Sequence, residues 1–318
     1  MKSYSVVIPT NKQANDIQAL LQSLAEQTRP PAEVIIVWDH KATADELKVY
    51  EIAVSIPFGP LKHTSVQVVH THTDKSFKPW RGVSYVRNYG RSKVTSKYTL
   101  FIDDDNIFDA SDSIQKLFAY TKSYNTDKTV VAPVQYRSSG PIRPSLAEGF
   151  CFATLRPRWI SSRKVNLRKR YFTLTMASSN CLLAKTEIFA RYQFDETIPF
   201  VYEDLILTSQ MTQSGIHILA DTSVRTIHED DDRGRLAKMY LNTPERTYQK
   251  SKHRRALVQA LKPTTWQVFL SHTLGLLGQT WWLRLHIFLF APSGSRRPLF
   301  DAVKHWTQDG LEQFSDAD

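Results

Sequence analysis

The chain has 318 residues, of which 42% are hydrophobic and 11% aromatic, so it can bury a sizeable core and is not disordered throughout. Its 41 Lys and Arg outnumber 31 Asp and Glu, and the net charge of +10 favours an anionic partner: nucleic acid, an acidic membrane surface or a phosphorylated small molecule. With only two cysteines, Cys151 and Cys181, the sequence offers no disulfide framework and no Cys-based zinc motif.

The first forty residues predict a strand–helix–strand unit. Ser5–Pro9 is a short β-branched run that predicts a buried strand, and Asn15–Gln27 carries apolar residues at the spacing of one helix face. Glu33–Trp38 predicts a second strand, and such a unit implies parallel strands joined by a right-handed crossover. The N-terminus lacks the long apolar core of a signal peptide, so we expect it to stay cytoplasmic.

The same alternation continues along the chain. Further helices are predicted over Asp45–Val54, Val83–Ser92, Ser111–Ser123, Thr186–Arg191 and Glu203–Ser214. Further strands are predicted over Ser65–His70, Tyr98–Ile102, Thr129–Pro133, His217–Ala220 and Val224–His228, and regular structure is predicted to resume over Ala177–Lys185. This order predicts an α/β fold, an open and mainly parallel sheet with helices on both faces.

Three aspartates, Asp103 to Asp105, follow directly after the apolar run Leu100-Phe101-Ile102. In an open α/β sheet, ligands bind beyond the carboxyl ends of the strands. Adjacent carboxylates repel one another there unless a cation or several donors compensate, and oxygen ligands suit a hard cation. The pattern therefore predicts a site for Mn²⁺ or Mg²⁺ with a diphosphate, although an acidic surface turn would show the same three residues.

Four segments together resemble family 2 glycosyltransferases of the GT-A fold, over about residues 4–230. They are Val6-Val7-Ile8-Pro9-Thr10-Asn11, Leu21-Gln22-Ser23-Leu24-Ala25-Glu26-Gln27-Thr28, Val34-Ile35-Ile36-Val37-Trp38-Asp39 and Val86-Arg87-Asn88-Tyr89-Gly90. The last resembles the Arg-Asn-x-Gly helix start that precedes the family's Asp-x-Asp strand. The resemblance implies a Rossmann-like sheet of mixed but mainly parallel strands.

The resemblance also implies roles on the donor side. The residues expected around the nucleotide sugar are Pro9, Thr10, Asn11, Asp39, Arg87, Asp103 and Asp104. Asp103 and Asp105 would be the Asp-x-Asp pair that holds Mn²⁺ or Mg²⁺, with Asp105 the direct ligand. His228 would face the metal or the diphosphate, and Asp104 would contact the ribose or the donor sugar.

On the acceptor side, Tyr202-Glu203-Asp204-Leu205 resembles the family's Glu-Asp motif at a helix start. An inverting transfer needs a base that takes the proton of the attacking hydroxyl, and we expect Asp204 to be that base. Glu203 would orient Asp204 or bind acceptor. Asn180 and Trp80 are further candidates for acceptor contacts.

The resemblance predicts a catalytic domain over 1–235, with a nucleotide-binding half over about 1–106 and an acceptor half over about 107–235. A helical C-terminal region follows over 236–318. Its stretch 265–291 has an amphipathic pattern. Two readings stay open: attachment in the plane of an anionic membrane, helped by basic residues at 250–255, or packing against the catalytic domain or a second subunit to form a homo-oligomer.

The function implied is inverting transfer of a UDP- or dTDP-linked sugar to a hydroxyl of a glycan or lipid-linked acceptor. Cell-surface glycan synthesis at the cytoplasmic face of the cell membrane would suit such an enzyme, with no nucleic-acid partner.

Two alternatives remain. A nucleotidyltransferase would usually show a Gly-rich phosphate loop, which Pro9-Thr10-Asn11-Lys12-Gln13 lacks. A nucleic-acid-binding protein would use the basic and aromatic stretch 138–175 as its main site.

Overall fold

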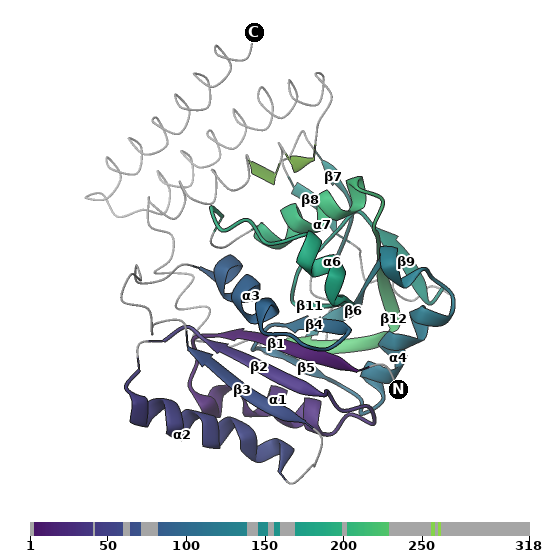
Figure 1. The fold of residues 1–318 in the computed structure, drawn as a ribbon. Helices are drawn as coiled ribbons and strands as arrows, with labels where there is room; N and C mark the ends of the chain where they lie inside the picture. Colours follow the sequence, from purple (N-terminus) through teal and green to yellow (C-terminus); the bar gives the residue numbers. More distant parts are fainter. Residues whose placement is uncertain are drawn as a thin grey trace, which may run out of the picture. The chain divides into compact units, whose positions relative to one another are not determined.

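The computed structural model of the chain describes residues 3–40, 42–59, 64–70, 82–138, 146–151, 156–159, 169–198, 202–228, 256–257 and 260–261. The chain divides into two compact units. The first is Met1–Gly149 with Trp159–Asp230, and the second is Phe150–Arg158 with Asp231–Asp318. The helices and strands that carry the candidate site belong to the first unit (Figure 1).

The first unit is built on a mixed sheet in which nine described strands take part. Their bounds are β1 (Tyr4–Thr10), β2 (Glu33–Trp38), β3 (Ser65–His70), β4 (Tyr98–Ile102), β5 (Asn106–Phe108), β6 (Thr129–Arg137), β9 (Tyr171–Leu174), β11 (Cys181–Lys185) and β12 (His217–His228). The spatial order is β3-β2-β1-β4-β11-β6-β12-β5, and β9 pairs with β12. β1 to β4 pair in parallel, whereas β11 runs antiparallel between β4 and β6. The predicted α/β fold is confirmed.

Two hydrophobic clusters cover the two faces of this sheet. Along β1, Val6 and Ile8 enter one cluster and Val7 enters the other, as the two-residue period of a strand requires. The first cluster includes residues of α1 (Gln18–Ala25), α2 (Ala44–Ser55) and α4 (Ser113–Leu117). The second includes residues of α3 (Val83–Ser92), α6 (Thr186–Arg191) and α7 (Glu203–Gln213). Figure 1 shows α3 and α2 on opposite sides of the strand layer.

Several helical segments are shorter than predicted because tight turns take up their ends. The 3-10 turns are η1 (Ala14–Ile17), η2 (Ile56–Phe58), η4 (Phe118–Lys122) and η5 (Thr126–Lys128). The helix predicted over Asn15–Gln27 is η1 followed by α1, and the one predicted over Ser111–Ser123 is α4 followed by η4. Such turns are common at helix ends, where backbone groups lack intrahelical partners.

The strands are interrupted less than the sequence predicts. Two strands were expected over 217–220 and 224–228, but β12 is one strand whose pairing with β6 shifts register between Asp221 and Arg225. The shift lies opposite Pro133, which has no N–H to donate to a ladder. The irregularity accommodates the proline, so β6 continues past Pro133 instead of ending there. The regular segment predicted over Ala177–Lys185 is, by contrast, divided between two strands: β10 (Met176–Ala177), which pairs with β7 (Leu146–Cys151), and β11. The remaining short strand is β8 (Arg156–Trp159).

Within the described residues, no helix is long and apolar enough to cross a membrane. Several parts of the sequence-based prediction lie outside the described residues: the acceptor candidate Trp80, the basic residues at 250–255 and the amphipathic stretch 265–291. Of the predicted C-terminal region 236–318, only 256–257 and 260–261 are described, and of the basic and aromatic stretch 138–175 only a part is described.

Gly90 allows α3 to lie directly on the sheet. A Cβ added to Gly90 would lie 2.5 Å from Cγ1 of Val7 and 2.7 Å from Cγ2 of Val37, on the adjacent strands β1 and β2. Atoms this close must move apart, and short branched valine side chains inside a packed core have little room to do so. The glycine of the Arg-Asn-x-Gly segment therefore sets the distance between this helix and the two strands.

We expect Gly90→Ala to lower the free energy of unfolding by about 1–3 kcal/mol, the usual penalty for an extra group in a packed core. Alanine is also the better helix former by about 1 kcal/mol, which by itself would raise the stability. The sign of the measured change in free energy of unfolding shows whether the packing penalty or the helix propensity is larger. Urea denaturation would measure it, with Ser92→Ala at the exposed end of the same helix as the control. An unchanged or raised stability would show that α3 has room to move.

Candidate functional site

The three aspartates form a tight turn between β4 and β5. The backbone N–H of Asn106 donates to the carbonyl of Asp103 at 3.2 Å, and the N–H of Asp103 donates to the carbonyl of Asn180 at 3.0 Å. Because β4 lies between β1 and β11 in the sheet, the turn stands at the edge where the parallel strands end. Each of the three carboxylates then binds a different set of partners.

Asp104 is held by the loop that follows β1. Thr10 Oγ1 donates to Asp104 Oδ2 at 2.6 Å, and Lys12 Nζ lies 3.1 Å from Oδ1. Burial raises the pKa of Asp104 to about 6, although the Lys12 ammonium and the Thr10 hydroxyl both pull it down. The predicted nucleotide residue Thr10 thus contacts the aspartate turn directly, and Lys12, which the sequence did not single out, contacts it too.

Asp103 is paired with a buried arginine. Arg87 of α3 donates from Nη2 to Asp103 Oδ1 at 2.7 Å and from Nη1 to Glu203 Oε1 at 2.8 Å. Only 4% of Arg87 and 5% of Glu203 is exposed. The guanidinium therefore joins the end of β4 to the first residue of α7, and little of it is left for contact with a ligand.

The charges around Arg87 do not balance. Burial by itself lowers the pKa of the guanidinium, but the charges of Asp103, Glu203 and Asp204 outweigh it and the net shift is upward. Burial raises the pKa of Asp103, and the charges of Asp105 and Asp204 add to that while Arg87 opposes it. Burial together with the charge of Asp204 raises the pKa of Glu203 to about 7. One positive charge faces several carboxylates, so a further cation would stabilise this site.

Asp105 lies between β12 and the start of β5. His228 Nε2 is 2.8 Å from Asp105 Oδ2, and Asn106 Nδ2 donates to Asp105 Oδ1 at 2.8 Å. Within the described chain, no three His, Cys, Asp or Glu side chains are grouped as a metal site would need. Mg²⁺ commonly binds through one or two carboxylates plus substrate phosphates, so the oxygen donors of Asp103 and Asp105 fit such an ion chemically.

Asp204 is oriented by three donors. Ser178 Oγ donates to Oδ2 at 2.7 Å, the N–H of Ser179 donates to Oδ2 at 3.0 Å, and the N–H of Leu205 donates to Oδ1 at 2.7 Å. Tyr202 precedes the motif with a φ of 75°, the single positive value among described residues other than glycine. Such a backbone costs about 1–3 kcal/mol and is most often found at functional sites. Tyr202 is the N-cap residue of α7, so this backbone conformation leads directly into Glu203 and Asp204.

The helix α3 also holds the segment that leads toward α7. Asn88 Nδ2 donates to the carbonyl of Phe194 at 2.9 Å and Oε1 of Glu196 at 3.0 Å, and Asn88 Oδ1 accepts from the N–H of Phe194 at 3.0 Å. Ser84 Oγ donates to the carbonyl of Ile198 at 2.6 Å. The Arg-Asn-x-Gly segment thus has a separate structural task for each named residue: an ion pair, a loop anchor and close packing.

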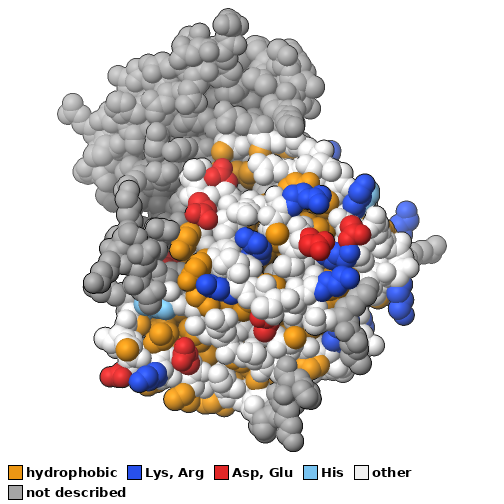
Figure 2. Space-filling model, viewed as in Figure 1, with side chains coloured by type: hydrophobic (Ala, Val, Ile, Leu, Met, Phe, Trp, Pro, Cys, Tyr) orange, Lys and Arg blue, Asp and Glu red, His pale blue; other side chains and the backbone are white. Residues whose placement is uncertain are grey.

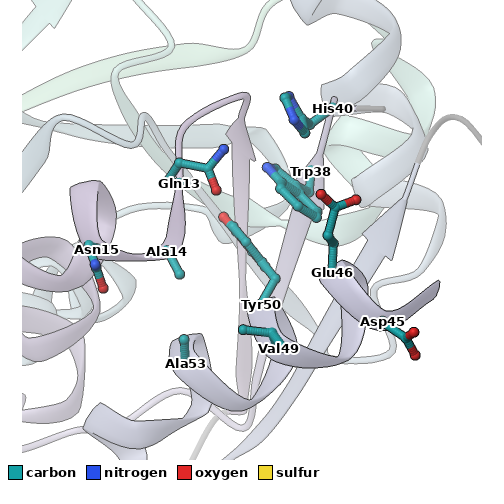
Figure 3. A pocket seen from close by; sticks show the side chains of 10 residues that line it. All are labelled: Gln13, Ala14, Asn15, Trp38, His40, Asp45, Glu46, Val49, Tyr50 and Ala53. Carbon is teal, nitrogen blue, oxygen red and sulfur yellow. The ribbon is translucent and has the colours of Figure 1, made fainter. Parts of the chain in front are cut away.

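A pocket of about 430 Å³ lies between the β1–η1 connection, the end of β2 and α2 (Figure 3). Its lining is Gln13, Ala14, Asn15, Trp38, His40, Asp45, Glu46, Val49, Tyr50 and Ala53. The centroid of the Trp38 ring lies 4.0 Å from that of Tyr50 and 5.1 Å from that of His40, and both pairs are stacked. Figure 3 shows the three rings next to one another. Trp38 Nε1 donates to the carbonyl of Lys12 at 3.0 Å, so the aromatic wall is tied to the loop that binds Asp104.

The other predicted nucleotide residues lie at the ends of β1 and β2. The N–H of Asp39 donates to the carbonyl of Thr10 at 2.8 Å, Pro9 is buried in β1, and Asn11 is exposed just after it. Asn180, predicted to contact acceptor, lies before β11 and donates from Nδ2 to Gln135 Oε1 at 2.7 Å.

The sequence did not single out Lys12, Trp38, Tyr50 or Gln135. Trp38 and Tyr50 follow the apolar pattern of a core strand and a helix face, and Lys12 is one of 41 basic residues. Gln135 follows Pro133, where the predicted strand was ended. If the predicted strand is continued past Pro133, Gln135 becomes a polar residue at a buried strand position. That is the pattern by which the sequence could have indicated Gln135.

The family model for glycosyl transferase family 2 matches residues 5–193, more than half of the chain. The chain belongs to this family. A curated relative from Haemophilus influenzae, described as an uncharacterized glycosyltransferase, is 26% identical over 168 residues, which are 52% of this chain and 49% of the relative. The chain therefore spans about half the length of the curated relative that it matches.

Solved structures share the fold of this family 2 chain. The structure of GalNAc-T7 with UDP, GalNAc and Mn²⁺ matches with a TM-score of 0.60 and 13% identity, over 96% of this chain and 55% of that one. The structure of S. aureus TarS 1-349 with UDP-GlcNAc matches with a TM-score of 0.56 and 16% identity, over 97% of this chain and 81% of that one. These likenesses support the GT-A arrangement of the sheet and its helices.

The raised pKa of Glu203 predicts a measurable pH dependence of stability. The folded state keeps the proton until about pH 7, whereas the unfolded chain releases it near 4.5, so the wild-type free energy of unfolding falls as pH rises through this window. Glu203→Gln carries no titrating proton at this position, so its stability does not fall in this way. We expect the difference in free energy of unfolding, variant minus wild type, to rise by about 3 kcal/mol between about pH 4.5 and about pH 8.

Chemical denaturation at several pH values would measure this difference, with Glu187→Gln at an exposed position of α6 as the control for loss of one carboxylate. A difference that stays constant with pH would show that Glu203 ionises as easily in the folded protein as in the unfolded chain.

Proposed function

We propose that this family 2 chain is an inverting glycosyltransferase that moves a sugar from a nucleoside-diphosphate donor to an acceptor hydroxyl. The observation that carries the proposal is the buried Arg87, which joins the Asp103 turn to the start of α7. Through this link the donor-side carboxylates and Asp204 come to one edge of the sheet. The charge of Asp204 is close enough to raise the pKa of both Asp103 and Glu203.

On the donor side, we assign Asp103 and Asp105 to a divalent ion, Mn²⁺ or Mg²⁺, with His228 next to Asp105. Such an ion stabilises the departing diphosphate as a Lewis acid. Two observations support the assignment: the oxygen donors suit a hard cation, and the carboxylates at this edge outnumber the buried guanidinium that faces them. The GalNAc-T7 structure that shares this fold contains Mn²⁺ and UDP.

For the nucleoside, we assign the pocket beside Trp38 and the ends of β1 and β2. Trp38 is 3% exposed and stacks against Tyr50 and His40, so a planar base would stack on the exposed ring of His40. Lys12 and Thr10 hold Asp104 next to this region, where its carboxylate can accept a hydrogen bond from the ribose or the donor sugar. A UDP- or dTDP-linked sugar has the chemistry that this arrangement would bind.

Asp204 is the proposed base. It takes the proton of the acceptor hydroxyl while the hydroxyl oxygen bonds to the anomeric carbon, and the bond from that carbon to the diphosphate breaks with its electron pair on the diphosphate. Ser178, Ser179 and Leu205 hold the carboxylate in one orientation for this step. Glu203 faces Arg87 in the interior, so we assign it to positioning instead of acceptor contact.

The net positive charge of the chain fits an anionic diphosphate donor, so this charge does not require a nucleic-acid partner. Figure 2 shows basic side chains interspersed with acidic and hydrophobic ones on this face of the described residues, without one continuous basic patch. A glycan or lipid-linked acceptor, in cell-surface glycan synthesis at the inner face of a membrane, remains our proposal for the biological setting.

We expect Asp105→Ala to remove Mn²⁺-dependent turnover while the protein stays folded. A screen of nucleotide sugars for Mn²⁺-dependent hydrolysis identifies the donor first, and thermal shift then reports donor binding, because a bound ligand raises apparent stability. Asp109→Asn, at an exposed position after β5, is the matched control. Full Mn²⁺-dependent activity in a folded Asp105→Ala variant would contradict the assigned metal site.

We expect Asp204→Asn to lower kcat by about 10²–10⁴-fold, the usual contribution of general acid–base catalysis, with little change in donor affinity. The amide is nearly the same size as the carboxylate but cannot take the acceptor proton. Steady-state transfer assays give kcat, and titration with UDP gives the affinity for the donor side. A variant with wild-type kcat would exclude Asp204 as the base.

A further inference from the structure

A chain of side-chain amides runs along the sheet edge beside the candidate site. Asn180 Nδ2 donates to Gln135 Oε1 at 2.7 Å, Gln135 Nε2 donates to Asn106 Oδ1, and Asn106 Nδ2 donates to Asp105 Oδ1 at 2.8 Å. Gln135 belongs to β6, Asn106 begins β5, and Asn180 directly precedes β11. Three separate strands thus bring these amides together.

Every hydrogen bond in this chain points the same way. Each amide donates toward Asp105 and accepts from the side away from it, so the amide dipoles add at the Asp105 carboxylate. Aligned hydrogen bonds in a low-dielectric interior strengthen one another. Asn106 is fully buried and Gln135 is 2% exposed, so water does not replace these bonds.

The far end of the chain contacts the proposed base. Ser178 Oγ lies 2.7 Å from Asn180 Oδ1 and 2.7 Å from Asp204 Oδ2, and its single hydrogen can serve only one of them at a time. The same row of side chains therefore starts at Asp204 and ends at Asp105. Gln135 is its middle member, and it contacts neither carboxylate itself.

A purely structural role explains these residues less well. Val131 and Val134 are buried on the two faces of β6 in an otherwise apolar core, and the amides of Asn106, Gln135 and Asn180 form a connected polar group beside them. Buried polar groups are expensive unless all are satisfied, so a buried amide with both ends engaged indicates a requirement for its polarity.

We propose that Gln135 is a positioning residue for the donor metal site: through Asn106 it holds the Asp105 carboxylate in place, and through Asn180 and Ser178 it reaches Asp204. The inference rests on the proposed function, in which Asp105 is a metal ligand. Partners that hydrogen-bond to metal-ligating carboxylates typically contribute about 10–100-fold to metal affinity or activity.

The test is Mn²⁺ binding to the 318-residue chain in the presence of UDP, followed by electron paramagnetic resonance. We expect Gln135→Met, which keeps the volume and removes both hydrogen bonds, to weaken Mn²⁺ binding about tenfold, the lower end of this range, because Gln135 acts on Asp105 through Asn106. Val134→Ala, a neighbouring change in the same strand that does not touch the amides, should leave the Mn²⁺ midpoint unchanged. Loss of folded protein would lower the amplitude of the titration, whereas lost positioning moves its midpoint.

A second variant covers the case in which Gln135→Met does not fold. Asn180→Ala, at a partly exposed position, removes the donor to Gln135, and it should also move the Mn²⁺ midpoint upward. Ser178→Ala should lower kcat and move the Mn²⁺ midpoint less than either of them, since Asn180, Gln135 and Asn106 stay connected.

The outcomes separate the two proposals. If wild type binds Mn²⁺ with UDP and both Gln135→Met and Asn180→Ala keep its midpoint, the positioning role is wrong and the proposed function stands. If wild type binds no Mn²⁺ with UDP, the metal assignment fails, and the role of Gln135 fails with it.

Discussion

The buried guanidinium of Arg87 is the interaction on which the rest of the site depends. It binds Asp103 at the end of a central strand and Glu203 at the start of α7, two residues that the chain order places far apart. Breaking a buried ion pair costs about 3–5 kcal/mol, since it leaves a charge without a partner. Arg87 can reach both carboxylates because Gly90, one turn further along α3, lets the helix lie against β1 and β2.

The site manages its excess negative charge in three ways. Asp103 faces a guanidinium, Asp104 faces an ammonium and a hydroxyl, and Asp105 faces an imidazole and a row of neutral amides. The amides orient a carboxylate without adding a positive charge that would repel a cation. Burial still raises the pKa of both Asp103 and Asp104, so an added cation would stabilise the ionised turn.

Three structural links meet at the aspartate turn, and they come from a helix, a loop and a row of side-chain amides. α3 connects the aspartate turn to α7, the loop after β1 connects it to the aromatic pocket, and the amides connect it to Ser178 and Asp204. In the proposed function, these links would let one tight turn of three residues take part in binding a nucleotide, a sugar and a diphosphate. The chain belongs to glycosyl transferase family 2, and it shares its fold with solved structures.

The sequence by itself determined the regular elements, because their signals are local. The bounds of β2, β3, α3, β4 and α6 follow from hydrophobic periodicity and flanking turns, and the aspartates stand out because they follow a buried strand. Only the tertiary structure decided which polar groups meet. Gln135 and Arg87 find their partners through strand order and helix packing, and the continuation of β6 past Pro133 depends on the register of β12. Such contacts join distant segments, and no local pattern encodes them.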